Sequence, residues 1–169
     1  MLPDSSIARN LALFFGVTFA LTTTFDIWTT WVGVHQFGYT ELNPFTDTSS
    51  IQAMATPEVI TLFIGMATVA TAAHFSKTLR PLPDERFRSF YKRFFSAEKP
   101  LKFLICLPIL LAVARSVAVL NNTSLILYDQ GLYGVTTPWL NMSVRAIAYI
   151  LLMHPTMYFI YVICFRSKR

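Results

Sequence analysis

Four long apolar stretches, separated by polar segments, dominate the hydrophobic pattern of this chain. They cover residues 10–34, 57–75, 101–120 and 144–165. A helix rises 1.5 Å per residue, so about 20 apolar residues cross a hydrocarbon core of about 30 Å. The first stretch contains Asp26 and is too long for the core of a signal peptide. We therefore expect an all-α fold, a four-helix membrane bundle forming a single transmembrane domain over residues 1–169.

A shorter element is predicted between the second and third stretches, over residues 84–95. Aromatic residues recur there at helical spacing, and basic residues occupy the opposite side. The aromatic set is Phe87, Phe90, Tyr91, Phe94 and Phe95, and the basic set is Arg86, Arg88, Lys92 and Arg93. This pattern is typical of a helix lying in the membrane interface, with its apolar face in lipid and its basic face toward the headgroups. Docking onto a partner protein is the alternative.

The basic residues are distributed so that they predict an orientation in the membrane. The chain has 14 Lys and Arg residues, and none lies in residues 36–55 or 121–143. Short loops on the cytoplasmic side retain Lys and Arg, whereas loops on the outer side lack them. Both termini and the 76–100 segment are therefore expected to be cytoplasmic.

Composition supports a membrane protein and argues against a nucleic-acid-binding one. Hydrophobic residues make up 54% of the chain, only 14% are charged, and the mean hydropathy is +0.49. The net charge of +5 comes from basic residues at span ends and in one loop, where they meet anionic headgroups. We expect a multi-pass protein of a bacterial or archaeal cell membrane, in contact with the lipid bilayer and with no nucleic-acid partner.

Polar residues inside the predicted spans are the candidate functional residues. Asp26 lies at membrane depth, and the threonines three and four residues away from it extend one polar stripe along the helix. An isolated charge there costs at least a few kcal/mol, so a partner is expected. Arg115 lies at a similar depth on the third span, and Asn122 lies two turns further along the same face. We predict an Asp26–Arg115 ion pair bridged by Thr30 or Asn122. Such a pair either holds two helices in register or forms a functional polar site.

Enzyme and metal signatures are weak in this sequence. His35, Glu41 and Asn43 follow Asp26, but they are scattered over a helix end and a loop, unlike strong metal-binding motifs. The chain has no HExxH motif and no Ser or Cys nucleophile with a His at matching depth. We expect no catalytic residues, no metal and no cofactor.

One segment resembles a known family. Residues 26–44 contain Asp26 and Thr30, then Gly38, Glu41, Asn43 and Pro44, in the pattern D-x3-T followed by G-x2-E-x-N-P. This pattern is similar to that of small bacterial and archaeal multi-span proteins of unknown function. The resemblance implies that these residues form one local unit at the end of a span and in the following outer turn, and it brings no reaction with it.

Three functions are compatible with these features. The first, which the scarcity of chemical signatures favours, is a subunit or assembly factor of a larger membrane complex, or a homo-oligomer. The second is a small transporter or channel that uses Asp26 and Arg115 in a polar path. The third is a membrane-embedded enzyme acting at the outer face through Asp26, His35 and Glu41.

Overall fold

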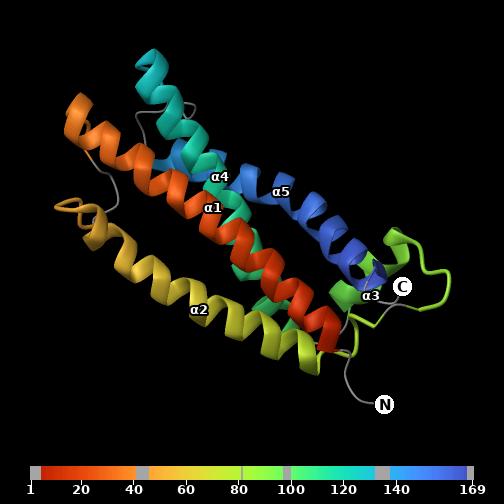
Figure 1. Ribbon diagram of the computed structural model, residues 1–169. Coiled ribbons are helices and arrows are strands. Elements are labelled where there is room, and N and C mark those ends of the chain that lie inside the picture. Colours follow the sequence, from red (N-terminus) through yellow and green to blue (C-terminus); the bar gives the residue numbers. More distant parts are fainter. Residues whose placement is uncertain (1–4, 41–45, 81, 97–99, 132–137, 167–169) are drawn as a thin grey trace.

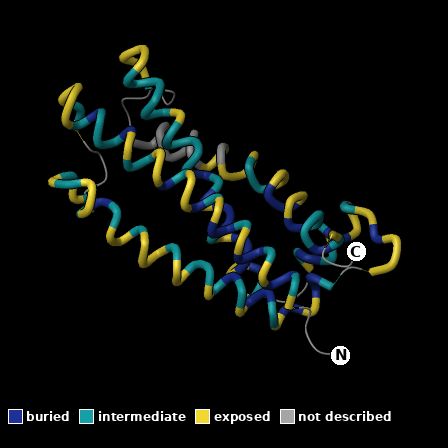
Figure 2. The backbone as a smooth tube through the Cα atoms, viewed as in Figure 1, coloured by how far each residue is buried: buried dark blue, intermediate teal, exposed yellow. Residues whose placement is uncertain are grey.

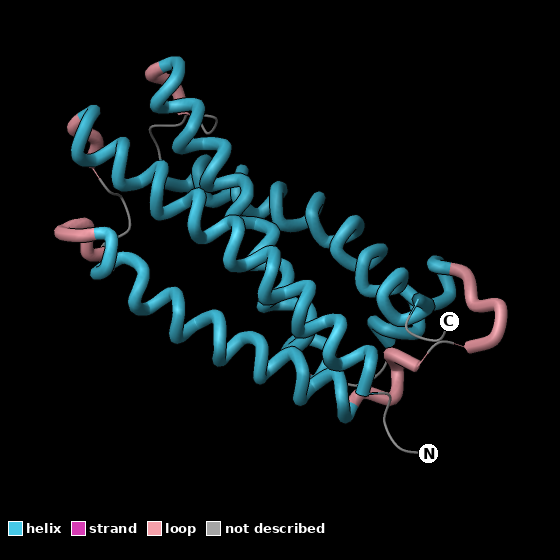
Figure 3. Tube along the Cα trace, viewed as in Figure 1, coloured by secondary structure: helices cyan, strands magenta, loops and turns pink. Residues whose placement is uncertain are grey.

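The described part of the chain is helical throughout its regular structure. The computed structural model describes residues 5–40, 46–80, 82–96, 100–131 and 138–166, without the side chains of 138–145 and 148. Its helices are α1 (Ser5–Phe37), α2 (Ile51–Phe75), α3 (Phe87–Ser96), α4 (Leu101–Tyr128) and α5 (Pro138–Arg166). Figure 3 shows that only loops join these helices in the described ranges. The predicted all-α fold is confirmed.

Four of the helices are long and apolar enough to cross a membrane, as predicted. With 33 and 28 residues, α1 and α4 extend about 50 Å and about 42 Å, which exceeds a hydrocarbon core of about 30 Å. Both helices therefore reach beyond the span that lipid requires. The segments that follow the ends of α1 and α4 can therefore contact each other outside the hydrocarbon core.

Several boundaries differ from the sequence prediction, and α1 and α5 begin at Ser5 and Pro138, five and six residues earlier than expected. Helix α2 begins six residues earlier than the expected Pro57, because Ser50 caps it by accepting a hydrogen bond from the amide of Ala53 at 3.0 Å. Pro57 lies inside this helix. Helix α4 continues past Leu120 to Tyr128, and Asp129 ends it in the left-handed conformation (φ 54°). The extension of α4 carries Asn122 into the bundle, where it contacts α1.

The long helices have two distinct ends. Helices α1 and α4 pack side by side in the same direction, and α2 and α5 run opposite to them (Figure 1). We call the end at which α1 and α4 begin the terminal end, and the end at which they finish the connection end. Helix α3 lies at the terminal end, beside the last turns of α5.

The apolar core lies in the half of the bundle nearer the terminal end. Figure 2 shows buried segments gathered there, whereas exposure increases toward the connection end. The core includes Ile7, Leu11 and Phe15 of α1, Val69 and Ala72 of α2, Ile105 and Ile109 of α4, and Met157 and Ile160 of α5. Large apolar side chains such as Phe25, Trp28 and Phe63 remain on the outside. An exterior of this kind suits lipid contact.

Two glycines, Gly16 of α1 and Gly65 of α2, lie in the contact between these helices. A β-carbon at Gly65 would lie 2.3 Å from Cζ of Phe15, and one at Gly16 would lie 2.9 Å from Sδ of Met66. The small residues at these positions let the two helices touch. From this contact they diverge toward the connection end (Figure 1).

Helix α3 is amphipathic as predicted, but its aromatic face is covered by protein. Phe90 and Phe94 are 0% and 1% exposed, and the ring of Phe87 packs 5.5 Å from those of Tyr158 and Tyr161 of α5. The prediction that this face lies in lipid is therefore wrong for Phe90 and Phe94. Of the basic residues, Arg88 and Lys92 on the opposite face are exposed, and so is Arg86 just before the helix, whereas Arg93 is half-buried.

A buried ion pair fixes the loop before α3. Arg93 donates two hydrogen bonds to the Glu85 carboxylate, at 2.8 Å and 2.7 Å, and it also donates to the carbonyls of Thr78 and Arg80. The Glu85 side chain is 4% exposed. The hydrogen bond from Arg93 lowers the pKa of Glu85 below its usual value, against the opposing effect of burial. This bidentate pair ties the loop to α3.

Candidate functional site

A polar seam joins α1 to α4 over the half of the bundle nearer the connection end. Its first contact is a hydrogen bond that the Thr22 hydroxyl donates to the carbonyl of Ala112, at 3.1 Å. Further along, the Asn122 amide donates to the Asp26 carboxylate and to the Thr30 hydroxyl, each at 3.3 Å. The threonine-rich stripe of α1 therefore faces α4. Asp26, Thr30 and Asn122, all selected from the sequence, lie together in this seam.

Arg115 of α4 connects three helices. Its Nη1 donates to the Thr23 hydroxyl of α1 at 2.9 Å, and its Nη2 lies against the Glu58 carboxylate of α2. Its guanidinium carbon lies 4.9 Å from the ring centroid of Phe19, within the range of a cation–π contact. The salt bridge of Arg115 is thus made with Glu58, and the predicted partner, Asp26, is replaced by an acid from another helix.

The Glu58–Arg115 pair uses only part of its hydrogen-bonding capacity. Nη2 lies 3.0 Å from Oε1 and 2.9 Å from Oε2, but it donates a hydrogen bond only to Oε1. Oε2 is buried and receives no hydrogen bond from the described part of the chain. Of the five N–H donors of a guanidinium, Arg115 uses two toward described residues. Buried polar groups are normally satisfied. Oε2 is held in the ion pair by its 2.9 Å separation from Nη2, whereas the remaining N–H groups of Arg115 make no hydrogen bond to the described residues.

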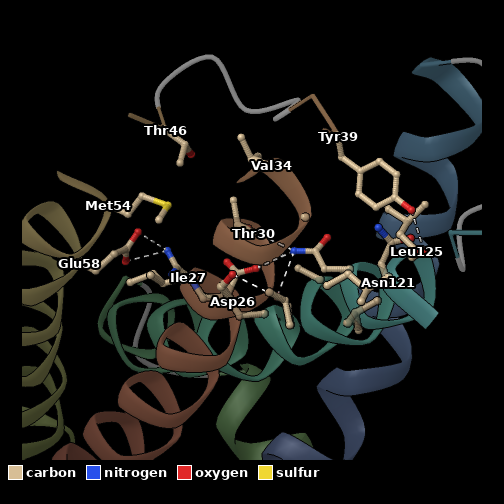
Figure 4. Close-up of a pocket in the computed structure, with 18 of the residues that line it drawn as sticks. Asp26, Ile27, Thr30, Val34, Tyr39, Thr46, Met54, Glu58, Asn121 and Leu125 are labelled. Atoms are coloured by element: carbon tan, nitrogen blue, oxygen red, sulfur yellow. Dashed lines mark hydrogen bonds and ion pairs between the residues drawn. The ribbon is translucent and has the colours of Figure 1, made fainter. Parts of the chain in front are cut away.

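These side chains line a cavity of about 490 Å³ between α1, α2 and α4. Figure 4 shows Asp26, Thr30, Glu58 and Asn121 around it. Apolar side chains complete the walls, namely Ile27, Val34, Met54, Leu111, Val117 and Ile126. Sites for small molecules are typically clefts of about 300–1,000 Å³ with mostly apolar walls and a few convergent polar groups. This cavity fits that description.

The loop after α1 borders the cavity at the connection end. Gly38 has φ 71°, which turns the chain so that the amide of Tyr39 bonds to the carbonyl of Gly33 at 3.0 Å. The Tyr39 hydroxyl lies 3.0 Å from the Leu125 carbonyl and 2.9 Å from the Asp129 carboxylate. The hydrogen bond to Asp129 raises the pKa of Tyr39. Tyr39, which also lines the cavity, therefore links the end of α1 to the end of α4.

The remaining predicted residues fall outside this site. Glu41, Asn43 and Pro44 lie outside the described residues, so the predicted outer turn stays a prediction. His35 is exposed and stacks on Trp31, with ring centroids 3.6 Å apart, and it is not among the cavity residues. Within the described ranges, no three His, Cys, Asp or Glu side chains gather as metal ligands.

Glu58 is the site residue that sequence reasoning missed. Thr56-Pro57-Glu58 has the form of a helix start, and an acid in a first turn is favourable at the membrane surface. With α2 starting at Ile51, Glu58 lies two turns inside the helix and reaches Arg115. The Ser49-Ser50 pair upstream was the available signal, because serine is a preferred N-cap residue.

No family model, curated protein or solved structure matches this chain. The resemblance of residues 26–44 therefore stays a prediction. Function is argued below from the cavity and its residues.

Proposed function

We propose that this chain is a small multi-pass membrane transporter that binds a polar solute in the cavity between α1, α2 and α4. The observation that carries the proposal is the set of charged side chains on the cavity wall: Asp26, Glu58 and Arg115, one from each helix. Ionisable residues at membrane depth are costly and commonly mark substrate or ion paths. A purely structural ion pair does not require a hollow of about 490 Å³ beside it.

The cavity also weakens the case for an obligatory subunit of a larger complex. If Asp26 and Arg115 faced outward, another chain would have to cover them in the membrane. Both residues instead line the cavity within this chain. The exposed apolar faces, which include Phe25 and Phe63, are covered equally well by lipid.

The proposed orientation places the terminal end in the cytoplasm and opens the cavity toward the outer half of the membrane. It rests on the distribution of Lys and Arg, because the exposed Arg86, Arg88 and Lys92 lie at the terminal end. The resemblance of residues 26–44 favours a bacterial or archaeal membrane.

Single cysteines test this orientation. Ser49→Cys and Arg88→Cys, both at exposed positions, are made in a background with the two native cysteines replaced by alanine. A membrane-impermeant maleimide added to intact cells should label Ser49→Cys and leave Arg88→Cys unlabelled until the membrane is permeabilised. The reverse pattern contradicts the proposed orientation.

Solute access tests the proposed function itself. In the same background, Thr30→Cys places a thiol on the cavity wall, and Ala72→Cys places one in the apolar core, where Ala72 is 2% exposed. A small water-soluble thiol reagent should modify Thr30→Cys in right-side-out and in inside-out vesicles, while Ala72→Cys stays unreactive in both. A transporter exposes its site to each side in turn. Thr30→Cys that resists the reagent from both sides refutes the proposal.

A further inference from the structure

The tyrosine that joins the ends of α1 and α4 also lies on the wall of the cavity. We infer that Tyr39 is a gate, closed in this structure, that controls access to the cavity from the connection end; this inference rests on the proposed function. The Tyr39 side chain reaches from the segment after α1 toward Leu125 of α4 (Figure 4). At 1.5 Å per residue, Asp26 lies about 16 Å before the end of α1 at Phe37. A solute that enters between the ends of α1 and α4 therefore meets the Tyr39 ring before it reaches the charged groups.

A tight turn seats the Tyr39 ring on α1. Gly38 has φ 71°, and the amide of Tyr39 bonds back to the carbonyl of Gly33 at 3.0 Å. The ring then lies so close to Gly33 that a β-carbon there would be 3.3 Å from Cδ2 of Tyr39. The Phe37 ring stacks against it, with centroids 5.9 Å apart. These contacts hold the ring where its hydroxyl meets α4.

The contact between the Tyr39 hydroxyl and α4 can be broken at small cost. The hydroxyl has one proton, and two acceptors lie beside it, the Leu125 carbonyl at 3.0 Å and the Asp129 carboxylate at 2.9 Å. The Leu125 carbonyl also accepts a hydrogen bond from the amide of Asp129 at 2.9 Å, and Asp129 is exposed. When the hydroxyl leaves, neither acceptor is buried without a partner, so the usual penalty for an unsatisfied polar group is absent.

The bundle is also least packed around this contact. The apolar core lies nearer the terminal end, and exposure increases toward the connection end (Figure 2). Local opening costs least where few buried apolar contacts have to be broken. The connection end therefore opens while the terminal end stays packed, and access to the cavity changes on one side of the membrane.

Gly38 is the hinge of this gate. Rotation about its backbone swings Tyr39 away from α4, and no atom lies within 4 Å of a β-carbon built at Gly38. A side chain there consequently acts through backbone conformation alone. Glycine adopts a positive φ without strain and asparagine does so readily, whereas the β-branched side chain of valine strongly disfavours it. Gly38→Val and Gly38→Asn thus form a matched pair that leaves the cavity wall unchanged.

The test measures how fast a small water-soluble thiol reagent modifies Thr30→Cys in sealed vesicles, in the background without the native cysteines. The reagent is added on the side where Ser49→Cys is labelled, which is the side of the connection end. Tyr39→Phe should raise the rate about two- to tenfold, as expected for the loss of one ordinary hydrogen bond. Gly38→Val should raise the rate as well. Gly38→Asn should keep the wild-type rate, and so should Tyr128→Phe, at a residue that is 72% exposed.

The two sides of the membrane and the Gly38 pair make the outcomes distinct. Equal rates in the wild type, Tyr39→Phe and Gly38→Val, with Thr30→Cys reactive in all three, overturn the gate and leave the proposed transport function standing. A rate that rises equally from both sides also overturns the gate, because it reports a general loosening of the bundle. Thr30→Cys that resists the reagent in every variant overturns the gate and the proposed function together. The Gly38 pair decides the question even if Tyr39→Phe folds poorly.

Discussion

The contact between α1 and α2 provides the sharpest structural prediction, because one added methyl group should push the two helices apart. In Gly65→Ala the new β-carbon would lie 2.3 Å and 2.4 Å from two ring carbons of Phe15. Carbon atoms pack at about 3.5–4.0 Å, so a shift of more than about 1 Å is needed. Phe15 is 2% exposed and belongs to the core, so its ring has little room to move.

The magnitude follows from two opposing effects. Overpacking a well-packed interior costs about 1–3 kcal/mol, whereas replacing glycine by alanine inside a helix recovers up to about 1 kcal/mol. We expect Gly65→Ala to lower the free energy of unfolding by about 1–2 kcal/mol. Gly16→Ala is the matched control, because its β-carbon would meet Sδ of Met66 at 2.9 Å, the end of a flexible side chain that can rotate away.

Equilibrium unfolding by SDS in mixed micelles, followed by circular dichroism and tryptophan fluorescence, measures both variants. We expect the wild type and Gly16→Ala to have similar stability, and Gly65→Ala to be less stable than both. Equal stability of the two variants would contradict the observed packing of Phe15 on Gly65. If Gly65→Ala, combined with Thr30→Cys, lowers stability and also increases modification of that cysteine, this helix contact influences the width of the cavity.

Three further predictions concern the polar contacts. Glu58→Gln and Arg115→Gln should each lower the free energy of unfolding by about 1–3 kcal/mol, because each leaves a partly buried charge without its partner. The double variant should lose less than the sum of the two, and additive losses in a double-mutant cycle would refute the pair. The folded-state pKa of Glu85 lies below its unfolded value of 4.5, so the stability from this group is present above pH 4.5 and is lost as the pH falls through the folded pKa. Glu85→Gln should lack that acid-dependent loss of stability. An unfolding profile with the same pH dependence as the wild type would contradict the assignment. Tyr39→Phe should speed amide hydrogen exchange at the end of α4, because it removes the hydrogen bond to the Leu125 carbonyl. Tyr128→Phe, at a residue that is 72% exposed, is the control and should not change that exchange. Equal exchange rates in both variants would show that the Tyr39 hydroxyl does not hold α4.

The membrane-spanning helices were predictable because length and apolar content are sufficient to identify them. The start of α4 at Leu101 agrees with the prediction and follows its N-cap residue, Pro100. Its end was predicted eight residues early, because the Asn121 to Ser124 run is polar and resembles a loop. In the folded chain Asn122 faces Asp26 and Thr30, so its polarity is satisfied within the bundle.

Other features required the three-dimensional arrangement. The pattern of α3 identifies the face that avoids water, but lipid and protein interior are equally apolar, so it cannot distinguish them. Phe90, for example, is covered by Tyr161 of α5, which is distant in sequence. Likewise, counting residues along the spans predicts that Arg115 and Asp26 lie at the same depth. Which acid pairs with Arg115 depends on how α2 packs against α4, and the fold brings Glu58 of α2 within 3.0 Å of Arg115.

Native mass spectrometry after gentle extraction from the native membrane tests the central claim most directly. If the cavity beside Asp26, Glu58 and Arg115 holds a solute, the chain should appear alone or as a homo-oligomer. It should carry a small-molecule adduct that disappears in Glu58→Gln, and the Arg88→Gln control should retain the adduct. Stoichiometric association with a different membrane protein, with no bound small molecule on this chain, would contradict the account and identify the protein as a subunit of a complex.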